Sequence, residues 1–191
     1  MTEPSAIDDT HGARAEPHQR PRRAASRSAA RLAAVQALFQ IDSVGLDPHA
    51  AVEEFRAHRL GGADIDEGQP DLGHADTKHF AAIVLGASIR AAEIDALIAS
   101  VLPGDWSLYR IDPVIRALLR AGCFELLARD DVPVRVVADE YVSIANAFFE
   151  GVQTGFANAM LDALARRVRP EGFGAGHRRG RAGGLQMMAR G

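Results

Sequence analysis

A sustained apolar stripe between residues 80 and 101 is the strongest constraint on how this chain can fold. Its members recur at steps of three and four residues, the spacing that gathers side chains on one face of an α-helix. They are Phe80, Ile83, Val84, Ala87, Ala91, Ile94, Ile98 and Val101. Asp76 offers an N-cap before this stripe of about 22 residues and "LPGDW" ends it, so we predict a single helix over the whole stripe. A helix with one apolar stripe must bury that stripe against other elements.

The same periodicity predicts helices on both sides of this stripe. Asp112 and Pro113 mark the start of one of them, because Asp is a common N-cap residue and Pro suits the first helical position. Residues 134–149 begin with an alternation compatible with a strand, but their apolar side chains continue at steps of four, three and four, which favours a helix. The predicted helices cover residues 26–41, 48–59, 77–101, 113–129, 134–149 and 156–168. With no strand pair or hairpin signal, we predict an all-α fold, a compact bundle of six or seven helices with residues 150–155 as one of its loops.

The composition divides the chain into a folded body and two extensions. Residues 1–21 contain three prolines and scattered charges without an apolar period, and residues 170–191 are rich in Gly and Arg. We expect both extensions to be disordered. Residues 22–169 form the predicted folded domain. Hydrophobic residues make up 47% of the chain, which is enough for a buried core.

Cysteine usage indicates the compartment. Cys123 is the only cysteine, which excludes an intramolecular disulfide and a multi-cysteine metal site and suits a reducing cytoplasm. Its apolar surroundings favour a packed thiol over a reactive one. The N-terminus is polar and acidic, unlike a signal peptide, and no run of 18 apolar residues predicts a transmembrane helix. We therefore expect a cytoplasmic protein with no membrane partner.

Charge is distributed unevenly along the chain. The formal net charge of −3 combines +2 in residues 1–31, −11 in residues 32–165 and +6 in residues 166–191. An acidic body with two basic ends indicates a polyanion such as nucleic acid at the ends, and it would suit a basic protein at the body. The alternative is that the ends are solubilising tails.

The sequence carries no recognisable catalytic constellation. No Gly-rich phosphate loop follows a strand, and no histidine pair has the spacing of a zinc site. We interpret His79 as a partly buried neutral histidine. Asp139 and Glu140, which follow one another in the sequence, are interpreted as part of a solvated helix face. No serine, cysteine or lysine has an activating partner. We therefore predict a binding protein that is not an enzyme and needs no cofactor or metal.

The stretch "RPRRAASRSAARLAAVQALFQID" (residues 20–42) holds five arginines and no acid before its last residue. Arg23, Arg27 and Arg31 are four residues apart and share one side of a helix. Arg31 falls within the apolar arc, where an unpaired guanidinium would be costly, so it must either pair with an acid or lie at the rim. At the rim, arginines offer bidentate contacts to phosphate. Phe39, two turns further on, can pack in the core or stack on a base. A solvated or acid-paired face remains the alternative.

Four segments, in this order, resemble the transcription antitermination factor NusB family. They are "AVQALFQID", "IDPVIRALLRAGCFELL", "DVPVRVVADEYVSIANAFF" and "GFANAMLDALAR". The resemblance runs from about Arg27 to Arg167. It implies two packed helical sub-bundles that bind single-stranded box A RNA of ribosomal RNA leader transcripts. It also implies a heterodimer with the ribosomal protein NusE, and an indirect association with the elongating RNA polymerase.

The resemblance also implies which residues contact RNA. They are Arg22, Arg23, Arg27 and Arg31, the first-helix aromatic Phe39, and Phe156 and Asn158 near the start of the last helix. This sequence departs from the family pattern where Phe39 replaces a common tyrosine and Ala159 replaces a common glycine. Two alternatives stay open. One is the NusB-like RNA-binding domain of a ribosomal RNA cytosine methyltransferase, which would require a further domain; the other is a helical adaptor that binds only protein.

Overall fold

The computed structural model describes residues 19–60, 72, 74–104 and 106–173, with the backbone alone at residues 19–22 and 173. Its elements, in chain order, are α1 (Gln19–Val44), α2 (Pro48–His58), α3 (Thr77–Ile89), α4 (Ala91–Val101), η1 (Leu108–Arg110), α5 (Pro113–Ala128), α6 (Val134–Phe148), α7 (Val152–Val168) and η2 (Pro170–Phe173). The described part contains seven α-helices and no strand. The predicted all-α class is therefore confirmed.

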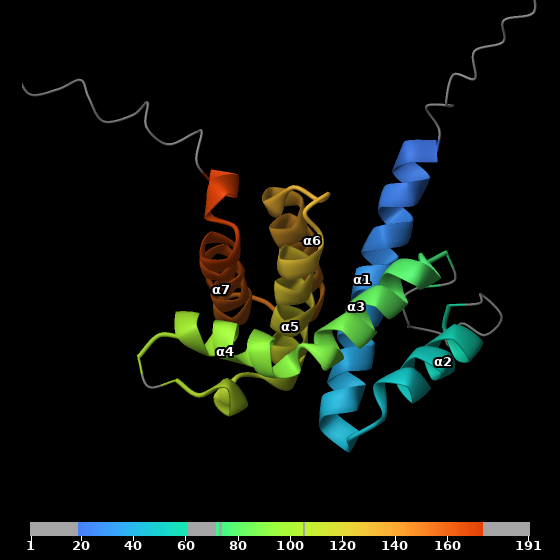
Figure 1. The fold of residues 1–191 in the computed structure, drawn as a ribbon, viewed down its shortest axis with the longest axis horizontal. Coiled ribbons are helices and arrows are strands. Elements are labelled where there is room, and N and C mark those ends of the chain that lie inside the picture. Colours follow the sequence, from blue (N-terminus) through green and yellow to red (C-terminus); the bar gives the residue numbers. More distant parts are fainter. Residues whose placement is uncertain (1–18, 61–71, 73, 105, 174–191) are drawn as a thin grey trace, which may run out of the picture.

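α5 is the central helix of the fold and packs against α1, α3, α4, α6 and α7. On one side of it, α1, α2 and α3 pack on one another; on the other, α6 and α7 pack together and α4 lies against α7 (Figure 1). This arrangement agrees with two helical sub-bundles that share α5 as their common wall. The first turns of α1 project beyond α3, so that end of the helix stands clear of the bundle (Figure 1).

Three helices begin with an aspartate whose side chain accepts hydrogen bonds from the first free backbone N–H groups. Asp47, Asp76 and Asp112 cap α2, α3 and α5 in this way. Pro48 and Pro113 follow two of these caps, at the position where a missing N–H costs nothing. The caps predicted at Asp76 and Asp112 are confirmed.

The single helix predicted over residues 77–101 is wrong, because the chain turns at Arg90 and forms α3 and α4. Arg90 leaves helical geometry (φ −97°, ψ 18°). Only one residue interrupts the helices, so the apolar steps continue across the break and conceal it in the sequence. The turn allows α3 to bury its stripe mainly against α1 and α4 to bury its own against α5 and α7.

The helix ends also extend beyond the predicted limits. α1 begins at Gln19, so residues 19–21 are helical, because Pro21 lies in the first turn where its N–H would have no partner. α7 begins at Val152, within the predicted loop 150–155, after Gly151 turns the chain with φ of 61°. The first four residues of the predicted disordered tail form η2. Residues 1–18 and 174–191 lie outside the described part.

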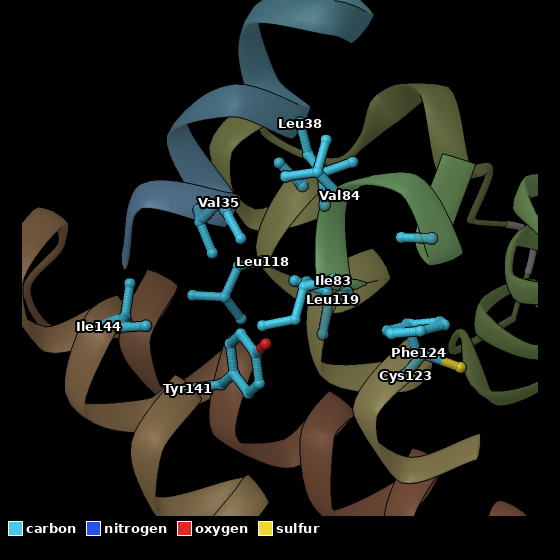
Figure 2. Packing of buried hydrophobic residues seen from close by; sticks show 14 of the residues in the cluster. Val35, Leu38, Ile83, Val84, Leu118, Leu119, Cys123, Phe124, Tyr141 and Ile144 are labelled. Atoms are coloured by element: carbon cyan, nitrogen blue, oxygen red, sulfur yellow. The ribbon is translucent and has the colours of Figure 1, made fainter. Parts of the chain in front are cut away.

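A continuous apolar core connects both sub-bundles through α5. Leu118 and Leu119 on α5 are fully buried between Ile83 of α3 and Tyr141 of α6 (Figure 2). Cys123 lies in the same core, and burial raises the pKa of its thiol to about 12, so the prediction of a packed, unreactive thiol agrees with the structure. No described helix has the length and apolar character needed to cross a membrane.

Gly86 of α3 lies directly against the side chain of Phe124 on α5. A Cβ atom at this position would overlap the ring of Phe124, at Cε2 and Cζ. We expect Gly86→Ala to lower the free energy of unfolding by about 1–3 kcal/mol, because the buried ring must leave its rotamer or push the helices apart. Urea denaturation measures this loss.

The matched control is Gly155→Ala on α7, where an added Cβ meets no atom within 4 Å. It is expected to raise stability by up to about 1 kcal/mol through helix propensity alone. Equal effects of the two substitutions would contradict the close-packing argument.

Candidate nucleic-acid interface

The first turns of α1 present exposed arginines. Arg23 and Arg27 are exposed, and neither has a carboxylate within salt-bridge distance among the described residues. Arg129 hydrogen-bonds Asp131 at 2.8 Å and holds the pKa of that carboxyl at about 2; the charge of Arg27 contributes further to this shift. Arg27 therefore lies near Asp131, but the carboxylate of Asp131 is hydrogen-bonded to Arg129. Arg22 belongs to the α1 backbone, and its side chain lies outside the described part.

Arg31 does not lie at the rim, and its predicted RNA contact is wrong for this structure. The side chain is buried, and Nε and Nη2 donate to the two carboxylate oxygens of Glu125 at 2.6 and 3.1 Å. Nη1 lies 3.3 Å from Glu140. Of the two possibilities that the sequence left open, pairing with an acid is the one observed. Glu140, predicted on a solvated face, is instead half-buried against Arg31 and accepts from Ser28 at 2.6 Å.

The buried pair belongs to a larger polar cluster at the centre of the fold. Burial alone would raise the pKa of Glu125, but the contacts with His79 and Arg31 outweigh it and lower the pKa to about 2. His79, which is buried, places Nε2 3.2 Å from Glu125, and Arg129 lies 3.1 Å from Nδ1 of the same ring. Burial also raises the pKa of Tyr141. The cluster connects α1, α3, α5 and α6, so it stabilises the fold rather than forming an interface.

Phe39 lies where α1 passes α2 and the end of α6, and 38% of it is exposed. It lines a groove of about 520 Å³ whose walls are mostly apolar. The groove is lined by Val35, Gln36, Phe39, Gln40, Ser43, Val44, Phe55, Arg59, Val114 and Phe148. Of the two roles open to Phe39 in the sequence, this location favours a surface aromatic over a core side chain.

Phe148 lines the same groove and was missed by the sequence prediction. Its position continues the apolar stripe of α6, which assigned it to the core. The last turn of α6 extends beyond that core, so 43% of Phe148 is exposed. An aromatic pair at residues 148–149, directly before a Gly-containing turn, is the one sequence signal that could have indicated a surface position.

Phe156 and Asn158 lie apart from the arginines. Asn158 is exposed on α7, whereas Phe156 is half-buried with its ring 5.4 Å from that of Trp106. α1 and α7 lie on opposite sides of α5 and α6 (Figure 1). The two regions are connected through the end of α6, because Thr154 Oγ1 donates to the carbonyl of Phe149 at 3.0 Å. The structure thus brings Phe39 together with Phe148, and it leaves Phe156 and Asn158 as a separate surface.

The sequence of this chain matches that of a known family. The sequence model of the NusB family matches residues 28–166. The chain belongs to the NusB family. Among its relatives is the transcription antitermination protein NusB of Maricaulis maris, 47% identical over 151 residues, which cover 79% of this chain and 92% of that protein. The NusB of Sphingopyxis alaskensis is 48% identical over 148 residues, covering 78% of this chain and 97% of the relative.

Solved structures agree with the NusB assignment. A crystal form of T. maritima NusB is 30% identical with a TM-score of 0.61, and the match covers 77% of this chain and 96% of that one. A chain in a structure described as "Crystal Structure of a Plectonemic RNA Supercoil" is 24% identical with a TM-score of 0.60, covering 73% of this chain and 94% of that one. At that identity the second likeness concerns the fold alone.

Proposed function

We propose that this NusB-family protein is a transcription antitermination factor that binds the box A RNA of ribosomal RNA leader transcripts together with NusE. It would act on the elongating RNA polymerase through that complex and carry out no chemistry of its own. The observation that carries the proposal is the presence, on one helix, of an exposed aromatic ring and of exposed arginines that pair with no carboxylate in the described part of the chain. The relatives, which are named transcription antitermination proteins, support the biological role.

The proposed RNA surface binds RNA through two kinds of contact, ionic contacts to phosphates and stacking on a base. Arg23 and Arg27 bind phosphates, with Arg22 as an extension of the same basic end. Phe39 lies about 24 Å beyond Arg23 and about 18 Å beyond Arg27 along α1, at a rise of 1.5 Å per residue, and stacks on a base. Unpaired bases in single-stranded RNA are available for such stacking, whereas bases in a duplex are not. Phe156 and Asn158 would contact a more distant part of the RNA.

NusE is proposed as the protein partner on grounds of charge. Residues 32–165 carry a net charge of −11, which complements a basic ribosomal protein. The basic ends remain available for RNA in such a complex. In an adaptor that binds only protein, Arg23 and Arg27 would instead pair with acidic residues of the partner.

A salt titration tests the RNA assignment. If the protein neutralises about four phosphates, the logarithm of the RNA association constant falls with that of the salt concentration at a slope near −3. The Arg23→Ala/Arg27→Ala variant is expected to bind box A RNA more weakly and to flatten the slope by about 1.4, at about 0.7 per phosphate. Fluorescence anisotropy with box A and scrambled RNA, with and without NusE, measures both quantities.

The control variant is Arg56→Ala/Arg90→Ala. It removes the same charge from two arginines that each pair with a glutamate three residues away, at 2.9 and 2.8 Å. It is expected to leave the slope within about 0.5 of the wild-type value. Equal slopes for wild type and the Arg23/Arg27 variant would reject the proposed phosphate contacts. Binding to NusE without any binding to RNA would favour the protein-only adaptor.

A further inference from the structure

The groove beside Phe39 carries two glutamines whose amide orientations are fixed by helix α2. Gln36 and Gln40 lie one turn apart on α1, and both line the groove. Their partners, Arg59 and Glu54, come from the end and the middle of the α2 region. Amide oxygen and nitrogen are hard to tell apart by shape, but the chemistry of a partner can decide between them.

Arg59 decides the orientation of Gln36. Its guanidinium can only donate hydrogen bonds, so the atom that it contacts at 3.2 Å must be the amide oxygen. Arg59 is itself held in place, with its guanidinium carbon 5.0 Å from the centre of the buried Phe55 ring. The Gln36 amide therefore keeps its N–H groups available as donors.

Glu54 imposes the opposite orientation on Gln40. A carboxylate can only accept, so the atom that lies 3.2 and 3.3 Å from its two oxygens must be the amide nitrogen. The Gln40 amide therefore keeps its oxygen available as an acceptor. One turn of α1 thus presents a fixed donor and a fixed acceptor beside two exposed aromatic rings.

We propose that this groove is a base-reading site for one nucleotide of the single-stranded RNA. Phe39 and Phe148 would stack on the base, and Gln36 and Gln40 would hydrogen-bond its edge. Glu54 and Arg59 act as positioning residues that set the donor–acceptor order. The inference rests on the proposed RNA-binding function and adds a specificity determinant to it.

Several properties of the groove favour a base as its occupant. Its volume of about 520 Å³ falls within the range of sites for small organic ligands. A planar aromatic ligand with a polar edge matches aromatic walls that carry two amides. The groove also lies on the same helix as the proposed phosphate contacts, so a strand held by Arg23 and Arg27 can extend toward it.

A coupling experiment tests the site. Each base of a box A RNA is removed in turn by abasic substitution, and each RNA is titrated with wild-type protein and with Gln36→Met/Gln40→Met. One position is expected to stand out. Removing its base costs the wild type both the stack and two hydrogen bonds but costs the variant the stack alone, so the loss of affinity is about 10- to 30-fold larger for the wild type. At every other position the two proteins are expected to lose equal affinity.

The role of α2 is tested with a matched pair of substitutions. Glu54→Gln removes the carboxylate that fixes Gln40, whereas Glu53→Gln makes the same charge change at a residue that pairs with Arg56. Glu54→Gln is expected to reduce discrimination among natural bases at the coupled position at least threefold, with the salt slope unchanged. Glu53→Gln is expected to leave that discrimination as in wild type.

The outcomes separate this inference from the proposed function. RNA binding in which no position couples to Gln36 and Gln40 would overturn the base-reading site and leave the antitermination proposal intact. Failure of wild type to bind box A RNA, with or without NusE, would overturn both. Equal effects of Glu54→Gln and Glu53→Gln would overturn the positioning role of α2.

Discussion

Glu125→Gln is expected to lower the free energy of unfolding by about 3–5 kcal/mol, because it removes the buried counter-charge of Arg31 and leaves only the partly exposed Glu140 beside that guanidinium. Arg31 is 3% exposed, and Glu125 is fully buried and forms its bidentate partner. The substitution preserves the size of the side chain, so the loss reports on charge rather than on packing. Urea denaturation followed by circular dichroism measures it.

Glu140→Gln is the matched control for this prediction. Its carboxylate also lies near Arg31, at 3.3 Å, but 26% of its side chain is exposed, so water screens the lost charge. The expected cost is below about 1 kcal/mol. If the two substitutions lowered the free energy of unfolding equally, burial of the Arg31–Glu125 pair would not be the cause of the larger loss expected for Glu125→Gln.

The pH dependence provides a second check on Glu125. Its pKa is lowered from 4.5 to about 2 in the folded protein, so the unfolded chain binds the proton more readily. The stability contributed by this lowered pKa is present in full above pH 4.5 and is lost as the pH falls toward 2. The difference between wild type and Glu125→Gln is therefore expected to shrink over that interval. A difference independent of pH would contradict the assignment.

Phe39→Ala is expected to weaken RNA binding by about 1–3 kcal/mol, the range for removing one base–aromatic stack. Because the ring is partly exposed, the substitution should change folding stability much less than a core substitution would. The salt slope is expected to remain at the wild-type value, since the ring contacts no phosphate. Anisotropy titrations over a range of salt concentrations measure both quantities.

Phe39→Tyr serves as the conservative variant, because it retains the aromatic face. Its affinity is expected to stay within about threefold of wild type, less than the loss of one stack. If Phe39→Ala bound RNA as tightly as Phe39→Tyr, the ring would have no stacking role and the groove would need another explanation.

Local signals in the sequence account for most of the fold. Asp112 followed by Pro113 predicts the start of α5 because the cap and the first-turn proline act within a few residues. The turn at Arg90 gives no such signal, since the apolar steps continue on both sides of it. Its cause is tertiary, namely the different partners of α3 and α4.

The candidate site was harder to predict, because it depends on partners that are distant in sequence. Arg31 could be assigned to the core or to the surface until Glu125, 94 residues away, is seen against it. Phe148 continues an apolar stripe, yet the core ends before the stripe does. The amide orientations of Gln36 and Gln40 depend on Arg59 and Glu54, whose positions follow from the packing of α2 on α1.

The most direct test of the proposed RNA surface is to map where the RNA lies on the protein. Box A RNA carrying photoreactive thiouridine can be crosslinked to the wild-type protein and the attached peptides identified by mass spectrometry. We expect crosslinks to peptides that contain Phe39 and Phe148, and these crosslinks should disappear when unlabelled box A RNA competes. Crosslinks confined to peptides elsewhere, with none in α1 or at the end of α6, would contradict the proposed RNA surface.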